Sequence, residues 1–229
     1  MYTGDDFNIG DFGDFAVPAM DSSLKMPLCL VLDRSASMRV VTTDGAMRIN
    51  ELNRNVRELL KFIKTDPKAS KICDIAIVSF GDVKPTVEVQ YSSIDDVYFQ
   101  DLKASGRTPM GQAVEKAIDM LQDRREYYKE HGIEHYKPIM MLMTDGLPTD
   151  EYKAAAERCS SMVNKKQLKI YPVGIGNDFN NEILAKFSPL VKPKQIVDMK
   201  GFMKLFELLS RSSSNPADDS IDKWFNDEF

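Results

Sequence analysis

An aspartate and two serines alternate in the stretch VLDRSASM, residues 31–38, directly after an apolar run. Asp33, Ser35 and Ser37 each carry a side-chain oxygen, and hard cations such as Mg²⁺ take oxygen ligands. Three such side chains at a spacing of two could therefore hold a cation. The same residue types also form turns and cap helices. These eight residues alone therefore leave both interpretations open.

Two later segments carry the same kind of chemistry. Thr108 lies in SGRTPMG, residues 105–111, and Asp145 lies in MTDGLPTD, residues 143–150. The run PIMMLMTDG ends in an acid, as the run before Asp33 does. Ligands of open α/β sheets bind beyond the carboxyl ends of the strands. We therefore expect Asp33 and Asp145 at the same edge of a sheet.

The elements that would position these residues alternate along the chain. Short apolar runs predict strands, and apolar residues at helical spacing predict helices. The expected strands are 27–32, 73–81, 85–91, 138–146, 168–176 and 194–199, and the expected helices are 46–64, 108–130, 150–166, 180–188 and 201–214. Alternation of this kind indicates parallel strands joined by helical crossovers. The predicted fold is α/β, a doubly wound, mainly parallel sheet with helices on both faces and a metal site at its carboxyl edge.

The three polar segments together resemble the metal-ion-dependent adhesion site of von Willebrand factor A domains, whose pattern is Asp-x-Ser-x-Ser, then Thr, then Asp. The resemblance extends from about residue 26 to 212 and includes the order of elements. The TPMG, TDGLPTD and LFELLSRSSS segments look most like short bacterial members, some of which are associated with tellurium resistance and stress operons. The implied organisation is an acidic, aromatic tail at 1–24, the domain at 25–212 and an acidic tail at 213–229.

By this resemblance, Ser35 and Ser37 bind the ion directly, Thr108 binds it directly or through water, and Asp33 and Asp145 hold coordinated waters. The implied ion is Mg²⁺, with Mn²⁺ or Ca²⁺ as alternatives. Neutral hydroxyl ligands leave the ion much of its positive charge, so it favours an external carboxylate. The expected partner is a protein that supplies an Asp or Glu.

Two local features of this motif need comment. Many members of the family have glycine between the two serines, where this chain has Ala36, which tolerates fewer backbone conformations. Thr108 precedes Pro109, a residue that helices accept at their first position. We therefore expect Thr108 to cap the helix as well as to face the metal.

The resemblance implies a cytoplasmic, metal-dependent protein-binding adaptor rather than an enzyme, working beside a kinase or phosphatase of the same operon. A metal-dependent hydrolase or phosphotransferase is the alternative. However, haloacid-dehalogenase-type phosphotransferases need a second aspartate where this chain has Ser35, and the sequence has no P-loop. A metal-activated water could attack a substrate, but no obvious base accompanies it.

The charge and composition of the chain limit the classes of partner that we expect. The net charge is −5, the first 24 residues hold five aspartates and no lysine or arginine, and residues 211–229 carry −3, so residues 25–210 carry +3. Acidic tails around a mildly basic body argue against nucleic-acid binding.

No apolar run is long enough for a membrane span, and the N-terminus is not a signal peptide. Three separated cysteines, Cys29, Cys73 and Cys159, favour a reducing cytoplasm.

Two further hypotheses stay open at this point. His131 and His135 could bind a metal at helical spacing, although Gly132 and Pro138 favour a loop. The tails, DDFNIGDFGDF and DDSIDKWFNDEF, combine carboxylates with aromatic residues and could act as placeholder ligands of the metal site. Alternatively they are solvated segments, or the domain is a structural module with an idle site and tail-mediated interactions.

Overall fold

One six-stranded sheet forms the centre of the molecule, in a computed structural model that describes residues 24–42, 45–176 and 179–196. The strand order is β3-β2-β1-β4-β5-β6. β3 runs antiparallel to β2, and all other neighbours are parallel. The strands are β1 (Met26–Asp33), β2 (Cys73–Phe80), β3 (Thr86–Ser93), β4 (Ile139–Thr144), β5 (Lys169–Ile175) and β6 (Lys194–Ile196).

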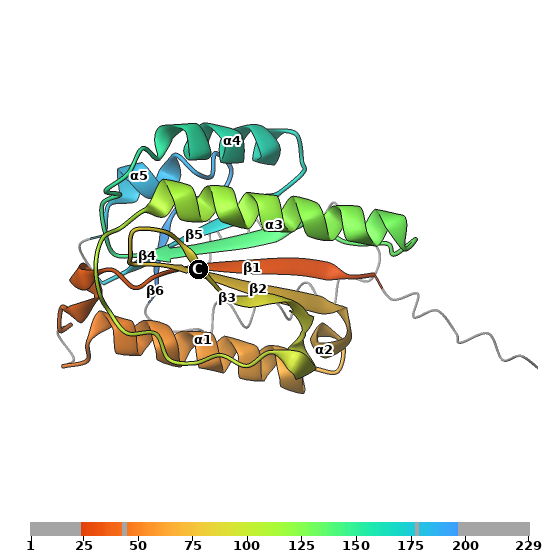
Figure 1. The fold of residues 1–229 in the computed structure, drawn as a ribbon, viewed down its shortest axis with the longest axis horizontal. Coiled ribbons are helices and arrows are strands. Elements are labelled where there is room, and N and C mark those ends of the chain that lie inside the picture. Colours follow the sequence, from red (N-terminus) through yellow and green to blue (C-terminus); the bar gives the residue numbers. More distant parts are fainter. Residues whose placement is uncertain (1–23, 43–44, 177–178, 197–229) are drawn as a thin grey trace, which may run out of the picture.

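Helices cover both faces of this sheet (Figure 1). One face carries α1 (Arg48–Thr65) and α2 (Ala69–Ile72); the other carries α3 (Met110–Glu130), α4 (Lys153–Asn164) and α5 (Asn181–Ala185). Two short 3₁₀ turns, η1 (Ala36–Arg39) and η2 (Ile94–Asp96), follow β1 and β3. The predicted α/β, mainly parallel fold with helices on both faces is confirmed.

The first strand shows why the fold needs two layers of helices. All eight residues of β1 are buried. Leu28, Leu30 and Leu32 face the core shared with α1, while Cys29 and Val31 face the core shared with α3. Full burial of such a side chain stabilises the fold by about 1.5–3 kcal/mol. A continuous apolar run is therefore what a central parallel strand requires.

The strand order reverses at β1, which places the site. β1 pairs with β2 on one side and with β4 on the other, so the chain winds away from β1 in both directions. The crevice at such a switch point lies beyond the carboxyl ends of the two central strands. Asp33 is the last residue of β1, and Asp145 directly follows β4.

Some predicted boundaries differ or lie outside the described residues. The helix expected at 108–130 begins at Met110, and the one expected at 150–166 begins at Lys153. The strand expected at 194–199 is described as far as Ile196. The helix expected at 201–214 and the tails, except Leu24, lie outside the described residues.

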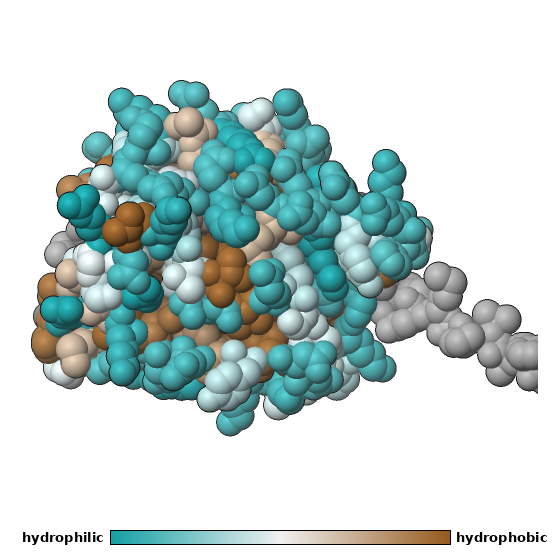
Figure 2. All heavy atoms as spheres, in the orientation of Figure 1, coloured by the Kyte–Doolittle hydropathy of each residue, from teal (hydrophilic) through white to brown (hydrophobic). Residues whose placement is uncertain are grey.

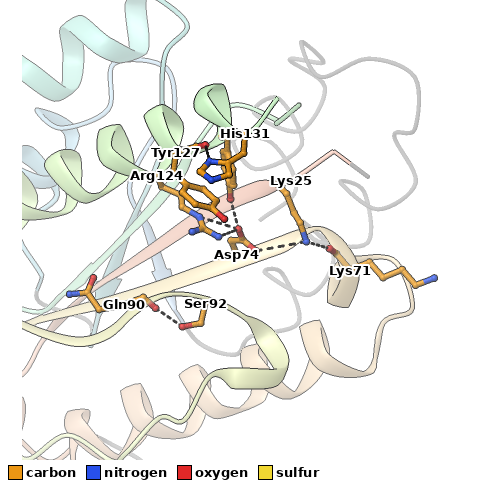
Figure 3. Close-up of polar contacts among 9 residues, drawn as sticks. Lys25, Lys71, Asp74, Gln90, Ser92, Arg124, Tyr127 and His131 are labelled. Atoms are coloured by element: carbon orange, nitrogen blue, oxygen red, sulfur yellow. Dashed lines mark hydrogen bonds and ion pairs between the residues drawn. The ribbon is translucent and has the colours of Figure 1, made fainter. Parts of the chain in front are cut away.

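A polar cluster closes the opposite, amino edge of the sheet (Figure 3). Asp74, buried at the start of β2, accepts hydrogen bonds from the Arg124 guanidinium and, at 2.6 Å, from the Tyr128 hydroxyl. Lys25 Nζ lies 4.0 Å from the same carboxylate. A buried charge held by two partners is a structural feature of the fold.

The two histidines lie beside this cluster and outside any helix. His131 follows the last residue of α3 and stacks on Tyr127, with ring centroids 4.1 Å apart. His135 lies in the loop before β4 with its ring 5.4 Å from that of Tyr128. The loop expected here is confirmed. Among residues 24–42, 45–176 and 179–196, none of the helices combines the length and hydrophobicity that a membrane crossing requires.

Candidate metal centre

Asp33 lies at the bottom of the crevice, where β1 ends. Its side chain is fully buried, and both carboxylate oxygens accept hydrogen bonds. The Ser35 amide donates to Oδ1 over 2.7 Å, and the Thr144 hydroxyl donates to Oδ2 over 2.5 Å. The first bond is a local turn, and the second joins the ends of β1 and β4. The carboxylate is therefore held in one orientation.

The two serines follow in the turn that leads into η1. Ser35 Oγ lies 2.9 Å from Ser37 Oγ, and the Ser37 hydroxyl donates to Asp145 Oδ1 over 2.7 Å. The alternate spacing thus places both hydroxyls on the same side of the chain. Asp33, Ser35, Ser37 and Asp145 therefore form one hydrogen-bonded group.

The loop before α3 brings Thr108 to the same place. The Ala36 amide donates to the Gly106 carbonyl over 3.2 Å, which ties this loop to the serine turn. Gly106 has φ +71°, and a Cβ there would lie 1.8 Å from the Gly81 carbonyl oxygen. Only glycine fits such a close approach between backbones. The strand ends of β1 and β2 and the Thr108 loop therefore contact one another directly.

The predicted capping role of Thr108 is wrong. Pro109 stands between Thr108 and the first helical residue, so the threonine side chain is one position too early to cap α3. Asp150 caps the helix instead, because its carboxylate accepts hydrogen bonds from the amides of Gly111, at 3.1 Å, and Gln112, at 2.9 Å.

Main-chain bonds hold Thr108 instead. Its amide donates to Thr149 Oγ1 over 3.0 Å, and the Thr149 amide donates to the Thr108 carbonyl over 2.9 Å. These bonds join the loop before α3 to the loop after β4. Thr108 is therefore positioned by the third polar segment rather than by its own helix.

Around Gly146, in the third polar segment, lie side-chain oxygens of the other two segments. A Cβ built on this residue would lie 3.5 Å from Ser37 Oγ and 3.8 Å from both Asp33 Oδ2 and Thr108 Oγ1. The lack of a side chain at Gly146 leaves this position open. A small cation coordinated by hydroxyls and waters needs such a space between its ligands.

Arg48, which the sequence analysis did not identify, also belongs to this group. It is the first residue of α1, is buried, and donates from Nη1 to Asp145 Oδ2 over 2.8 Å. Asp145 therefore has one oxygen toward Ser37 and the other toward a fixed positive charge. The Gly176 position at the end of β5 also lies close, because a Cβ there would be 2.7 Å from Arg48 Nε.

Burial dominates the electrostatics of Asp33. Removal from water raises the pKa of this carboxyl to about 6, although hydrogen bonds from Ser35 and Thr144 act in the opposite direction. The negative charge of Asp145 raises the pKa slightly further. Placing negative charge in this crevice is therefore unfavourable without a counter-charge. A divalent cation would supply it.

The donor set suits a hard ion. It contains two carboxylates and three hydroxyls, all oxygen, and no histidine or cysteine. No group of three or more His, Cys, Asp or Glu side chains in the described part of the chain could hold a metal. The set lacks the thiolate and imidazole ligands of a typical structural zinc site, and its oxygens suit Mg²⁺, which keeps several waters, as well as Ca²⁺ and Mn²⁺.

The alanine between the serines is compatible with this turn. Lys166 is the one non-glycine residue with positive φ in the described ranges, so Ala36 adopts an ordinary backbone conformation. Its side chain is exposed. The backbone of this chain therefore does not require glycine at position 36.

A known protein family matches the part of the chain that contains the three polar segments. The family model "von Willebrand factor type A domain" matches residues 28–209. The chain belongs to this family. A search of curated proteins finds no match. The family model covers all of the polar segments and every described helix and strand from β1 to β6, apart from the first two residues of β1.

Solved structures of other proteins share the fold. Proximal thread matrix protein 1 from the mussel byssus is 17% identical, with a TM-score of 0.56 over 83% of this chain and 46% of the mussel chain. Another structure of that protein has a zinc-occupied MIDAS motif, with 20% identity, a TM-score of 0.53 and the same two coverages. This chain thus spans about half the length of the mussel protein.

A third similar structure is manganese-loaded TRAP protein from Plasmodium vivax. It is 17% identical, with a TM-score of 0.57 over 79% of this chain and 71% of the TRAP chain. At these identities the comparison establishes the fold of this von Willebrand factor type A domain.

Proposed function

We propose that this von Willebrand factor type A domain is a metal-dependent protein-binding module that captures a partner's carboxylate. The observation that carries this proposal is the convergence of Asp33, Ser35, Ser37, Thr108 and Asp145 at the carboxyl edge of the sheet. Ser35 and Ser37 would bind the ion directly, Thr108 directly or through water, and the two aspartates would hold coordinated waters. When bound, the ion supplies a positive Lewis-acidic position for an external ligand.

The chemistry of the donors supports a carboxylate as that ligand. Neutral hydroxyls remove little of the charge of a divalent ion, so the ion attracts an anionic oxygen from outside. Arg48 adds a second positive charge beside Asp145. We propose Mg²⁺ as the resident ion, with Mn²⁺ or Ca²⁺ as alternatives; the manganese-loaded and zinc-occupied relatives support a divalent ion in general.

We assign the protein no catalytic residue. The two carboxylates of the site are engaged, Asp33 by Ser35 and Thr144, and Asp145 by Ser37 and Arg48. Both carboxylates therefore serve as acceptors within the group, and the group contains no further side chain that could act as the general base of a hydrolase or phosphotransferase. A binding role therefore explains the arrangement better than catalysis.

The proposed setting follows from the resemblance to short bacterial members of the family. We place the protein in the cytoplasm, in a stress-response, tellurium-resistance or defence system. A kinase or phosphatase of the same operon would then be the partner that supplies the Asp or Glu. Nucleic acid and membrane are not expected ligands.

The experiment is affinity capture from a lysate of the source organism. The baits are wild type and Ser35→Ala/Ser37→Ala, each with Mg²⁺ and with a chelator. Ser92→Ala/Ser93→Ala is the matched control, because it removes two hydroxyls at the amino edge of the sheet, where Ser93 pairs with Asp74. We expect a partner that only wild type and the control retain, and only with Mg²⁺. A partner retained equally under all conditions would contradict the proposal.

A further inference from the structure

Exposed apolar side chains gather around the carboxyl edge of the sheet. Val40 and Val41 follow the serine turn, Met47 precedes α1, Leu147 follows Asp145, and Val83 follows β2. Their exposures run from 41% for Met47 to 80% for Val83. Figure 2 shows hydrophobic side chains at the left of the molecule, the side where η1 lies in Figure 1. We name these five residues the apolar rim.

Contacts around the polar group place the rim beside the candidate metal centre. Val41 forms a β-bridge with Met47, and the Val40 amide donates to the Ser37 carbonyl over 3.0 Å. Leu147 is two residues beyond Asp145. Large exposed apolar groups that adjoin a polar site are characteristic of an interaction surface rather than of general surface.

A groove extends the rim past Thr108. Its volume is about 650 Å³, and its walls include Val83, Pro85 and Arg107. Lys84 also lines it, as does Asp82, whose carboxylate forms an ion pair with Arg34. The groove thus combines apolar walls with basic side chains, and it begins one residue from Thr108. An aromatic ring next to a carboxylate has the matching chemistry.

Exposed positive charge surrounds the same edge. Arg39 at the end of η1, Lys84 and Arg107 are all exposed. Residues 25–210 carry +3, whereas residues 1–24 carry −5 and no positive charge. The edge is therefore electrostatically complementary to the N-terminal segment of the same chain.

The N-terminal segment repeats one pattern. It reads GDDFNIGDFGDF from residue 4 to 15, in which Asp6, Asp11 and Asp14 are each followed by phenylalanine. Each repeat offers a carboxylate for a cation and an aromatic ring for an apolar surface. Three copies in ten residues give the segment several equivalent registers, which raises the effective concentration of the pair.

We propose that residues 5–15 bind the carboxyl edge of their own domain, with an Asp at the metal and the adjoining Phe on the apolar rim or in the groove. The segment would act as a self-ligand that an external acidic, aromatic partner has to displace. This inference rests on the proposed metal-dependent function, because the carboxylate needs the ion.

Chain length permits this contact. The described chain begins at Leu24, beside the amino end of β1, whose eight residues span about 26 Å at 3.3 Å each. Asp11 lies thirteen residues before Leu24 and Asp6 lies eighteen before it. Extended chain covers about 43 Å and 60 Å over those separations. Both aspartates can therefore reach the opposite edge of the same molecule.

Hydrogen–deuterium exchange of the full chain, with and without Mg²⁺, tests the contact. We expect Mg²⁺ to slow exchange of amides 5–15 at least severalfold in wild type. Leu147→Ser and Phe7→Ala/Phe12→Ala/Phe15→Ala should lose this protection. The matched control Leu190→Ser removes an equally exposed leucine, 53% against 58%, outside the rim and should retain it. Because all these side chains are exposed or outside the described core, the variants should fold.

Calorimetric titration with Mg²⁺ and sedimentation separate the possible results. Mg²⁺ binding without protection of residues 5–15 would overturn the self-ligand and leave the metal site standing. An absence of Mg²⁺ binding in wild type would overturn both proposals. Protection that appears only together with Mg²⁺-dependent dimers would overturn the self-ligand proposal, because the segment would then bind a second copy of the chain.

Discussion

The guanidinium of Arg48 and a divalent cation would compete for the same carboxylate, that of Asp145. The side chains of this pair are 9% and 0% exposed, and the atoms Nη1 and Oδ2 lie 2.8 Å apart. Breaking a buried ion pair by removing one partner leaves the other charge uncompensated. Arg48 therefore stabilises the metal-free site, and it also opposes a second positive charge beside it.

Replacing Arg48 by methionine should separate these two effects. We expect Arg48→Met to lower the free energy of unfolding by roughly 3–5 kcal/mol in chelator, because Asp145 stays buried without its partner. Saturating Mg²⁺ should restore more stability to the variant than to wild type. Chemical denaturation of both proteins, in chelator and in saturating Mg²⁺, measures these free energies of unfolding. Equal Mg²⁺-induced stabilisation of the two proteins would contradict the competition.

Asp33 predicts a pH dependence in the metal-free protein. Its pKa is about 6 in the fold and ordinarily 3.8, so the folded state holds the proton more tightly. This contribution stabilises the fold at low pH and is lost as pH rises from 4 through 6. In chelator at pH 7.5, Asp33→Asn should be more stable than wild type by on the order of 2 kcal/mol.

The control for this prediction is the same pair of proteins at lower pH and with metal. The advantage of Asp33→Asn should disappear near pH 3, below both pKa values, where the carboxyl is protonated in the folded and the unfolded state. Saturating Mg²⁺ should reverse the order at pH 7.5, because only wild type gains from the ion. A stability difference that does not change with pH would contradict the role given to burial of Asp33.

At the scale of elements, the start of α3 depends on a residue from another segment. The Asp150 carboxylate accepts hydrogen bonds from two amides in the first turn of the helix, and it follows the loop that holds Thr108. A carboxylate at a helix N-terminus satisfies free amides and complements the helix dipole. The cap therefore links the stability of α3 to the position of a metal-ligand candidate.

Asp150→Ala should lower the free energy of unfolding by about 1 kcal/mol, because the amides of Gly111 and Gln112 lose their acceptor. It should also weaken Mg²⁺ binding, since the neighbouring loop loses an anchor. Asp123→Ala, which removes an exposed acid from the same helix, is the matched control and should change neither quantity. Thermal unfolding and calorimetry provide the readouts. Unchanged Mg²⁺ affinity in Asp150→Ala would show that the cap does not affect the metal site.

At the scale of the whole molecule, the amino edge of the sheet contributes stability and the carboxyl edge carries the candidate binding site. The amino edge is closed by the buried pair of Asp74 and Arg124, whereas the carboxyl edge carries the polar group and the apolar rim. Asp74→Asn should therefore cost several kcal/mol of stability, as breakage of a buried pair does, and leave Mg²⁺ affinity unchanged in the folded protein. Loss of Mg²⁺ binding in a folded Asp74→Asn protein would show that the edges are coupled.

Much of this architecture could be predicted from the sequence because it depends on local patterns. Buried parallel strands require continuous apolar runs, and the acids that end them mark the carboxyl edge, so Asp33 and Asp145 could be placed together. The strand order and the antiparallel direction of β3 could not, because they arise from packing between distant segments. The cap by Asp150 was missed for the same reason, since its partners are 38 and 39 residues away.

Arg48 illustrates what pattern alone does not reveal. It lies in an amphipathic helix among other basic residues, and nothing in its spacing separates a buried arginine from a solvated one. Its role depends on the end of β4, 97 residues later. Thr144 is similar, because it ends an apolar strand and nothing in its neighbours indicates that its hydroxyl donates to Asp33.

We infer that this edge binds a divalent ion through Ser35 and Ser37. The experiment is isothermal titration of the chelator-treated full chain with Mg²⁺, comparing wild type, Ser35→Ala/Ser37→Ala and the control Ser92→Ala/Ser93→Ala. We predict one site per chain in wild type and control, and at least a tenfold loss of affinity in Ser35→Ala/Ser37→Ala. Equal binding by all three folded proteins, or no binding by wild type, would show that Ser35 and Ser37 do not form a metal site.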